Sequence, residues 1–219
     1  MNKYDIILFD LDGTISNSKE GITKCVQYAL SKFGIEEPDL DALEHFIGPP
    51  LRDEFKRAYG FTADEAEKAT AIYRERYEPV GIYEAYMYPG IAELLKFLKE
   101  NGKIIGLATS KPQDMAEEVL KYFNILEYFD YVMGAERVGP RQSKTDVLLE
   151  LFKEMGVSED KSGIVLIGDT CFDVQGAVNV GIDCIGVGYG FGNGQDMLDA
   201  GAVLIAEDAK ELINILGEV

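Results

Sequence analysis

The fold of this chain is decided by residues 4–14, which read YDIILFDLDGT. Residues 4–9 form a short apolar run that stops at Asp10, a pattern typical of a buried strand that leads into a polar loop. On an extended backbone two carboxylates two residues apart point the same way, so Asp10 and Asp12 are expected to face one site. Gly13 beside them allows a sharp turn. A turn that merely ends the strand is the alternative interpretation.

Beyond residue 88 the sequence alternates between helical and strand patterns. Strands are expected at 103–108, 131–133, 163–167, 183–187 and 202–205, and helices at about 91–101, 115–123, 145–155 and 174–180, with one more at the end of the chain. Such alternation is typical of a parallel sheet covered by helices on both faces. We therefore predict an α/β fold, a Rossmann-like parallel sheet, which binds ligands beyond the carboxyl ends of its strands.

Residues 19–81 carry no strand pattern. Apolar residues such as Ile22, Val26 and Ala29 recur at helical spacing, and the sequence Gly48-Pro49-Pro50 predicts a break between helices. We therefore expect a core domain of residues 1–15 and 88–219 and an inserted all-helical cap domain of residues 16–87, placed in the chain where a lid would be useful.

Composition narrows the class of partner. The chain has 21 Lys and Arg against 39 Asp and Glu, a formal charge of −18, which disfavours a nucleic acid polymer or an anionic membrane. The three cysteines share no CxxC spacing, the start of the chain does not resemble a signal peptide, and no apolar run approaches the roughly 20 residues of a membrane span. We expect a cytoplasmic protein that acts on a small molecule, with monomer and dimer both open.

Polar residues also follow the later expected strands. Thr109 and Ser110 could hold a phosphate oxygen or cap the next helix. Lys144 stands at a helix start, where it opposes the helix dipole, so a bound anion would explain its position; a solvated lysine is the alternative. Asp169 and Asp173, four residues apart, could share one face beside a cation, or Asp173 could cap the helix.

These motifs all lie just past an expected strand, and the carboxyl ends of parallel strands share one edge of a sheet. There they would supply carboxylates for Mg²⁺, one carboxylate free to attack and one to move a proton. A hydroxyl and an ammonium group would bind a phosphoryl group. The set predicts an enzyme that uses Mg²⁺ on a small phosphorylated metabolite.

The motifs resemble those of the haloacid dehalogenase-like superfamily, most closely its branch of phosphoglycolate phosphatases and 5′-nucleotidases with a helical cap of the C1 type. The loop Ile47-Gly48-Pro49-Pro50-Leu51 is similar to the cap loop of that branch. The resemblance implies that Asp10 is the nucleophile and becomes an aspartyl phosphate, and that Asp12 is the general acid and then the general base.

The resemblance also implies a ligand set. Mg²⁺ would be held by Asp10, the backbone carbonyl of Asp12 and Asp169, and Asp173 would support the metal or Lys144. The residues Thr109, Ser110 and Lys144 would bind the phosphoryl oxygens.

Substrate and reaction outcome stay open at this stage. Phosphoglycolate and nucleoside 5′-monophosphates are both candidates, and Gly48, Pro49 and Arg52 of the expected cap are candidate specificity residues. A phosphomutase of the β-phosphoglucomutase type would use the same residues but return the phosphoryl group to its substrate. A non-catalytic protein that binds a phosphorylated ligand is the third alternative.

Overall fold

The computed structural model describes residues 3–157 and 159–217. The chain forms two compact units, one made of residues up to 16 with residues from 87 onward, the other of residues 17–86. Each junction lies one residue from the expected domain boundary. Both ends of the expected core domain, residues 1–2 and 218–219, fall outside the described residues.

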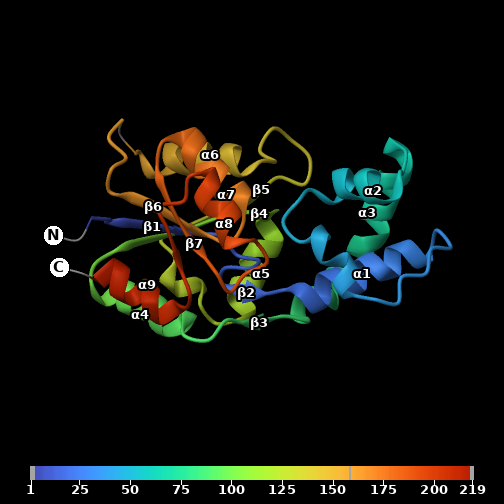
Figure 1. Cartoon of the computed structure of the whole chain (residues 1–219), viewed down its shortest axis with the longest axis horizontal. Coiled ribbons are helices and arrows are strands. Elements are labelled where there is room, and N and C mark those ends of the chain that lie inside the picture. Colours follow the sequence, from blue (N-terminus) through green and yellow to red (C-terminus); the bar gives the residue numbers. More distant parts are fainter. Residues whose placement is uncertain (1–2, 158, 218–219) are drawn as a thin grey trace. The chain divides into compact units, whose positions relative to one another are not determined.

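The first unit contains a six-stranded parallel sheet in the order β5-β4-β1-β6-β7-β8 (Figure 1). Its strands are β1 (Ile6–Phe9), β4 (Ile104–Pro112), β5 (Tyr131–Ala135), β6 (Ile164–Gly168), β7 (Asp183–Val187) and β8 (Leu204–Ala206). Two short strands at the junctions, β2 (Ser16–Asn17) and β3 (Tyr86–Met87), pair separately. The predicted α/β class with a Rossmann-like parallel sheet is confirmed.

Strand β1 lies in the middle of this sheet, paired with β4 on one side and β6 on the other. Its residues Ile7, Leu8 and Phe9 are fully buried, as the uninterrupted apolar run predicts for a strand covered on both faces. The chain adds β4 and β5 on one side of β1 and then β6, β7 and β8 on the other, so the strand order reverses beside β1. In open α/β sheets this reversal creates the ligand-binding crevice.

Helices cover both faces of the sheet, with α6 and α7 on one face and α4 and α9 on the other (Figure 1). The helices of this unit are α4 (Ile91–Glu100), α5 (Gln113–Tyr122), α6 (Lys144–Met155), α7 (Cys171–Val180), α8 (Gly194–Ala200) and α9 (Ala209–Gly217), with a 3-10 turn η3 (Leu126–Tyr128). No helix in residues 3–157 and 159–217 is long and apolar enough to pass through a bilayer.

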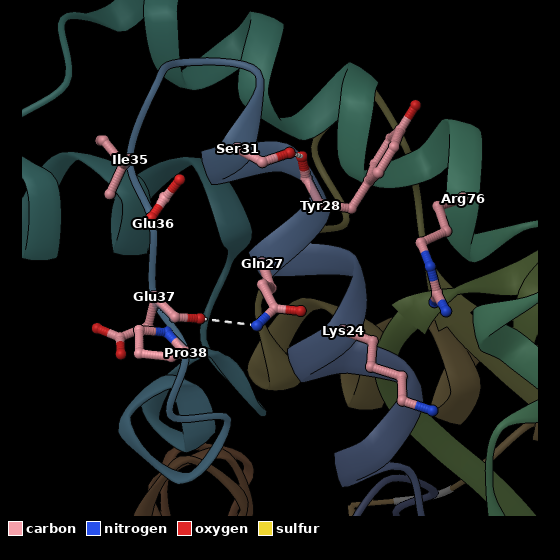
Figure 2. Close-up of a pocket in the computed structure, with 9 residues that line it drawn as sticks. All are labelled: Lys24, Gln27, Tyr28, Ser31, Ile35, Glu36, Glu37, Pro38 and Arg76. Atoms are coloured by element: carbon pink, nitrogen blue, oxygen red, sulfur yellow. Dashed lines mark hydrogen bonds between the residues drawn. The ribbon is translucent and has the colours of Figure 1, made fainter.

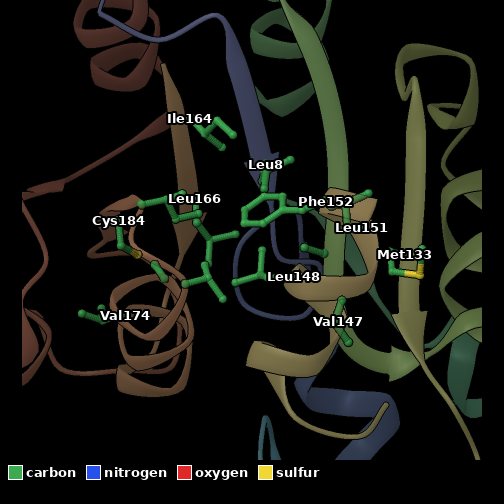
Figure 3. Close-up of a cluster of buried hydrophobic side chains, with 14 of the residues drawn as sticks. Leu8, Met133, Val147, Leu148, Leu151, Phe152, Ile164, Leu166, Val174 and Cys184 are labelled. Atoms are coloured by element: carbon green, nitrogen blue, oxygen red, sulfur yellow. The ribbon is translucent and has the colours of Figure 1, made fainter. Parts of the chain in front are cut away.

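The core beneath α6 and α7 fixes where these two helices begin. In Figure 3, Leu148 and Leu151 of α6 pack with Leu8 and Leu166 of the sheet, and all four side chains are fully buried. Full burial of such a side chain contributes roughly 1.5–3 kcal/mol. This packing holds the first turns of the two helices at the carboxyl edge of the sheet.

The second unit is helical, as expected for the insert. It contains α1 (Lys19–Ser31), α2 (Leu51–Tyr59) and α3 (Ala63–Tyr77), with the 3-10 segments η1 (Asp41–Phe46) and η2 (Gly81–Tyr83). The expected break at Gly48-Pro49-Pro50 is confirmed, because Gly48 has a φ of 101° and Pro50 caps the start of α2. Helix α3 begins at a capping box in which Thr62 and Glu65 exchange hydrogen bonds.

Some element bounds differ from the sequence-based expectation. Helices α5, α6 and α7 begin one to three residues earlier than expected, and the last strand begins at Leu204 rather than at residue 202. Helix α8 was not predicted. It forms because the Asn193 side chain accepts hydrogen bonds from the backbone N–H groups of Gln195 at 2.9 Å and Asp196 at 3.1 Å, which satisfies donors that a helix start leaves unpaired.

Candidate active site

The site lies at the carboxyl edge of the three central strands. Asp10 directly follows β1, Asp169 directly follows β6, and Thr109 lies near the end of β4. Because these strands are hydrogen-bonded neighbours, residues about 60 and 100 positions apart are brought to one place. The Asp10 backbone N–H donates to the Ile167 carbonyl at 2.9 Å, which ties the end of β1 to β6.

Three carboxylates form the centre of the site. Asp10, Asp169 and Asp173 each present one oxygen, and these oxygens all lie within 4.8 Å of one another. Asp169 and Asp173 are fully buried, and the Asp10 side chain is 13% exposed. Buried carboxylates this close repel one another strongly, because little water is present to screen their charges. The arrangement therefore needs a positive charge beside the carboxylates.

Lys144 supplies one such charge from the first residue of α6. Its ammonium lies 2.8 Å from Asp10 Oδ1 and 2.8 Å from Asp173 Oδ1. It also donates to the backbone carbonyl of Ala108 at 2.7 Å. The side chain is 4% exposed, so Lys144 is a buried site residue and not a solvated lysine. Two ion pairs and one hydrogen bond thus hold the ammonium in place.

A glycine in α7 makes room for this lysine. A Cβ atom on Gly176 would lie 2.5 Å from Lys144 Cγ, closer than real contacts allow. Glycine inside a helix costs about 1 kcal/mol relative to alanine. The close approach of the Lys144 stem is a physical reason for glycine at this position.

The charges of this cluster do not balance. Three carboxylates and one ammonium sum to −3 + 1 = −2. Burial raises the pKa of Asp10 to about 6, opposed by the positive charge of Lys144 and assisted by the negative charge of Asp173. Burial together with the charges of Asp173 and Asp10 raises the pKa of Asp169 well above its usual value. Burial opposes the charged form of Lys144, but its two carboxylate partners raise the pKa above the usual value.

The cluster fits a divalent cation. All of its donors are carboxylate oxygens, which hard cations such as Mg²⁺ and Ca²⁺ prefer, and a charge of +2 would cancel the excess of −2. The convergence of Asp10 and Asp169, whose pKa values are raised, is typical of sites that hold an ion.

Asp169 is held in place by hydrogen bonds to both of its oxygens. Thr14 Oγ1 donates to Oδ1 at 3.2 Å, and the Phe191 N–H donates to Oδ2 at 2.9 Å. The backbone approaches so closely that a Cβ on Gly13 would lie 2.0 Å from Asp169 Oδ2, and one on Gly190 would lie 2.3 Å from Asp169 Cβ. Gly190 and Phe191, which follow β7, therefore pack directly against Asp169.

Asp173 is the third residue of α7, so a role as the helix N-cap is wrong; Thr170 is the N-cap. Asp173 Oδ2 accepts hydrogen bonds from the Asp169 N–H at 3.2 Å, the Thr170 N–H at 3.0 Å and the Thr170 hydroxyl at 2.9 Å. Because its other oxygen pairs with Lys144, the contacts of Asp173 support that lysine. Direct ligation of a metal by Asp173 stays a prediction.

Thr109 belongs to the site but does not cap the following helix, whose N-cap is Pro112. Its hydroxyl is hydrogen-bonded to Asp10 and accepts the Lys111 N–H at 3.2 Å. Ser110 lies between these two residues and is half-buried. Phosphate binding by Thr109 and Ser110 stays a prediction.

Asp12 has a partner that the sequence analysis missed. Lys111 Nζ donates to Asp12 Oδ2 at 2.8 Å and to Oδ1 at 3.2 Å. The Lys111 side chain is 5% exposed and that of Asp12 is 16% exposed. No regular sequence pattern indicates this pairing, because the strand is irregular where Lys111 lies.

The candidate specificity residues Gly48, Pro49 and Arg52 lie in the helical unit. There Arg52 forms an ion pair with Glu67 of α3, in which Nη2 lies 3.2 Å from Oε1. A role for these three residues toward a substrate stays a prediction.

The helical unit also contains a pocket of about 590 Å³, shown in Figure 2. Its lining includes two cations, Lys24 and Arg76, and both form ion pairs with Glu84. Since their charge is already neutralised within the unit, this pocket lacks the unbalanced charge of the Asp10 cluster. We therefore place the candidate active site at the sheet edge.

Comparison with known proteins agrees with this geometry. The family model for haloacid dehalogenase-like hydrolases matches residues 7–187. A 5′-nucleotidase of Pseudomonas aeruginosa is 43% identical over 195 residues, 89% of this chain and 87% of that protein. A tyrosine-protein kinase of Mycobacterium tuberculosis is 34% identical over 207 residues, 94% of this chain and 69% of that protein.

Two further matches complete the comparison. A phosphoglycolate phosphatase of P. aeruginosa is 26% identical over 215 residues, 95% of this chain and 78% of that protein. The crystal structure of a predicted phosphatase from Clostridium acetobutylicum superimposes with a TM-score of 0.94 at 38% identity, over 99% of this chain and 100% of the other. The chain therefore belongs to the haloacid dehalogenase-like hydrolases and is a phosphatase of that family.

Proposed function

We propose that this phosphatase depends on Mg²⁺ and hydrolyses a small phosphate monoester through a phosphorylated Asp10. The observation that carries the proposal is the buried cluster of Asp10, Asp169 and Asp173. Its formal charge of −3 is only partly balanced by Lys144, which leaves −2. Asp10, Asp169 and the backbone carbonyl of Asp12 would hold the ion. When bound, Mg²⁺ would stabilise the charge that spreads over the phosphoryl oxygens in transfer.

In the first step an Asp10 carboxylate oxygen bonds to phosphorus while the bond from phosphorus to the leaving oxygen breaks. The Asp12 carboxyl group gives its proton to that oxygen, and the product alcohol departs. In the second step water attacks phosphorus, Asp12 takes a proton from that water, and the bond from phosphorus to Asp10 breaks. Inorganic phosphate leaves, and both aspartates return to their starting forms.

The proposed substrate is a nucleoside 5′-monophosphate. It is supported by the 43% identity to a protein named 5′-nucleotidase, against 26% to one named phosphoglycolate phosphatase. The formal charge of −18 supports a small phosphorylated partner rather than a nucleic acid polymer or an anionic membrane. A reducing compartment such as the cytoplasm suits three free thiols, those of Cys25, Cys171 and Cys184.

A phosphate-release screen tests the proposal. The protein is mixed with Mg²⁺ and nucleoside monophosphates, phosphoglycolate, sugar phosphates or ATP, because one relative bears a kinase name. We expect the highest kcat/KM for nucleoside 5′-monophosphates and no activity after chelation. Isomerised sugar phosphate without phosphate release would instead identify a phosphomutase, and transfer from ATP to a protein hydroxyl would identify a kinase.

The variant Asp10→Asn tests the nucleophile in the same screen. Removal of a nucleophile in other hydrolases lowers kcat by up to about 10⁶-fold. We expect activity to fall below detection, with tight binding of the phosphorylated ligand retained. Unchanged activity in Asp10→Asn would contradict the proposed function.

A further inference from the structure

The site contains a second buried lysine that the reaction scheme leaves without a role. Lys144 is accounted for by its contacts with two carboxylates and one carbonyl. The ammonium of Lys111 is instead paired with Asp12. A lysine that is 5% exposed gives up most of its hydration, so it requires a strong partner.

The backbone at the end of β4 aims Lys111 at Asp12. The pairing of β4 with β5 shifts register between Ala108 and Pro112, so the strand is irregular where Lys111 lies. The Lys111 N–H donates to Thr109 Oγ1 at 3.2 Å, which joins this lysine to the residue that is hydrogen-bonded to Asp10. The irregular strand end thus serves both aspartates of the motif Asp10-Leu11-Asp12.

The two contacts of the ammonium with Asp12 are unequal. Nζ lies 2.8 Å from Oδ2 and 3.2 Å from Oδ1. Both oxygens accept a hydrogen bond from the ammonium, and the contact with Oδ2 is the shorter one. A carboxyl group held through both oxygens has its χ angles restricted, so its oxygens occupy defined places.

We propose that Lys111 is a positioning residue for proton transfer, which holds the Asp12 carboxyl group in place through its two oxygens. This inference rests on the proposed function, in which Asp12 is the acid and then the base. The proton moves from the Asp12 carboxyl group to the leaving oxygen as the bond from that oxygen to phosphorus breaks, and later from the attacking water to the Asp12 carboxylate. Lys111 keeps its own protons throughout.

The test compares substrates that differ in how much they need this proton. An alkyl phosphate such as a nucleoside 5′-monophosphate requires protonation of its leaving oxygen, whereas p-nitrophenyl phosphate releases a stable anion. The kcat/KM value reports the steps up to and including the departure of the alcohol or phenol from phosphorus. We expect Lys111→Met to lower kcat/KM for the alkyl phosphate at least about tenfold more than for p-nitrophenyl phosphate, because misplacing a catalytic group by about 1 Å can cost about 100-fold.

A double-mutant cycle shows whether the lysine acts through Asp12. If it does, Asp12→Asn combined with Lys111→Met has the same kcat/KM for the alkyl phosphate as Asp12→Asn alone. Lys111→Gln provides a second variant in case the methionine protein does not fold. It retains a donor and is expected to show the same substrate dependence in weaker form.

The control is Lys103→Met, near the opposite end of the same strand. The Lys103 side chain is 7% exposed, donates to the Tyr4 carbonyl at 2.6 Å and pairs with Asp5 at 3.1 Å. Lys103 is about as buried as Lys111, but it lies just before β4, at the end of that strand that points away from the catalytic aspartates. We expect this variant to lower stability without changing the ratio of the two kcat/KM values.

The outcomes separate this inference from the proposed function. Equal losses for both substrates in Lys111→Met, or additive losses in the double variant, would overturn the positioning role. If Asp12→Asn itself shows no dependence on the leaving group, the proton-transfer role of Asp12 in the proposed function fails. If only Asp12→Asn shows that dependence, the proposed function stands and the role of Lys111 is refuted.

Discussion

Replacing Gly13 by alanine should disable the site while leaving the core unit folded. Gly13 has a φ of 90°, and its Cβ would lie 2.0 Å from Asp169 Oδ2 and 2.4 Å from Cγ. Real Cβ contacts under 3.0 Å essentially never occur, so the Asp169 carboxylate must retreat by about 1 Å. A shift of that size costs about 100-fold in rate, and the positive φ adds roughly 1–2 kcal/mol of backbone strain.

The assay measures kcat/KM with saturating Mg²⁺, the Mg²⁺ concentration for half-maximal activity, and thermal unfolding. We expect Gly13→Ala to lower kcat/KM about 100-fold and to weaken Mg²⁺ about tenfold or more. The matched control is Gly156→Ala at the end of α6, where φ is 65° and no atom lies within 4 Å of the added carbon. It should lose stability but keep its activity. A folded Gly13→Ala with nearly unchanged kcat/KM and Mg²⁺ dependence would refute the described packing against Asp169.

Three further predictions concern other parts of the structure. Gly176→Ala places a Cβ atom 2.5 Å from Lys144 Cγ and should displace this lysine. We expect a lower kcat in steady-state assays, although alanine stabilises a helix by about 1 kcal/mol relative to glycine. An unchanged kcat would contradict the close packing of Gly176 against Lys144. The pKa of Asp10 is raised to about 6, so the metal-free fold loses stability as pH rises from about 4 to 6, and below pH 6 Mg²⁺ must displace a proton from Asp10 to bind. The increase in Tm on adding Mg²⁺ should therefore become smaller as the pH is lowered. An increase in Tm that does not depend on pH would contradict this prediction. Thr62→Ala removes the α3 capping box and should cost about 1 kcal/mol in denaturant unfolding without altering kcat.

The convergence of the central residues was predictable from sequence. Asp10, Thr109 and Asp169 each follow an apolar run, and parallel strands deliver their carboxyl ends to one edge. Lys144 was predictable as a site residue because a lysine at a helix start opposes the helix dipole and needs a nearby negative charge. The structure supplies that charge as two carboxylates.

The contact of Lys111 with Asp12 and the packing of Gly190 against Asp169 were not predictable. Lys111 reaches Asp12 from an irregular strand end, whose register depends on the pairing of β4 with β5. The packing of Gly190 against Asp169 depends on how the chain returns after β7, which the local sequence does not specify. Both cases are tertiary contacts that leave no periodic signal in the local sequence.

Trapping the intermediate on Asp10 tests the central claim most directly. The protein is mixed with Mg²⁺ and a nucleoside 5′-monophosphate, quenched during turnover and treated with borohydride, which reduces an acyl phosphate on aspartate to homoserine. Mass spectrometry of the peptide that contains residues 4–14 then locates the modified residue. The proposed mechanism predicts homoserine at position 10, dependent on substrate and Mg²⁺ and absent from Asp10→Asn. Phosphate release without modification of Asp10, or modification at a different residue, would contradict it.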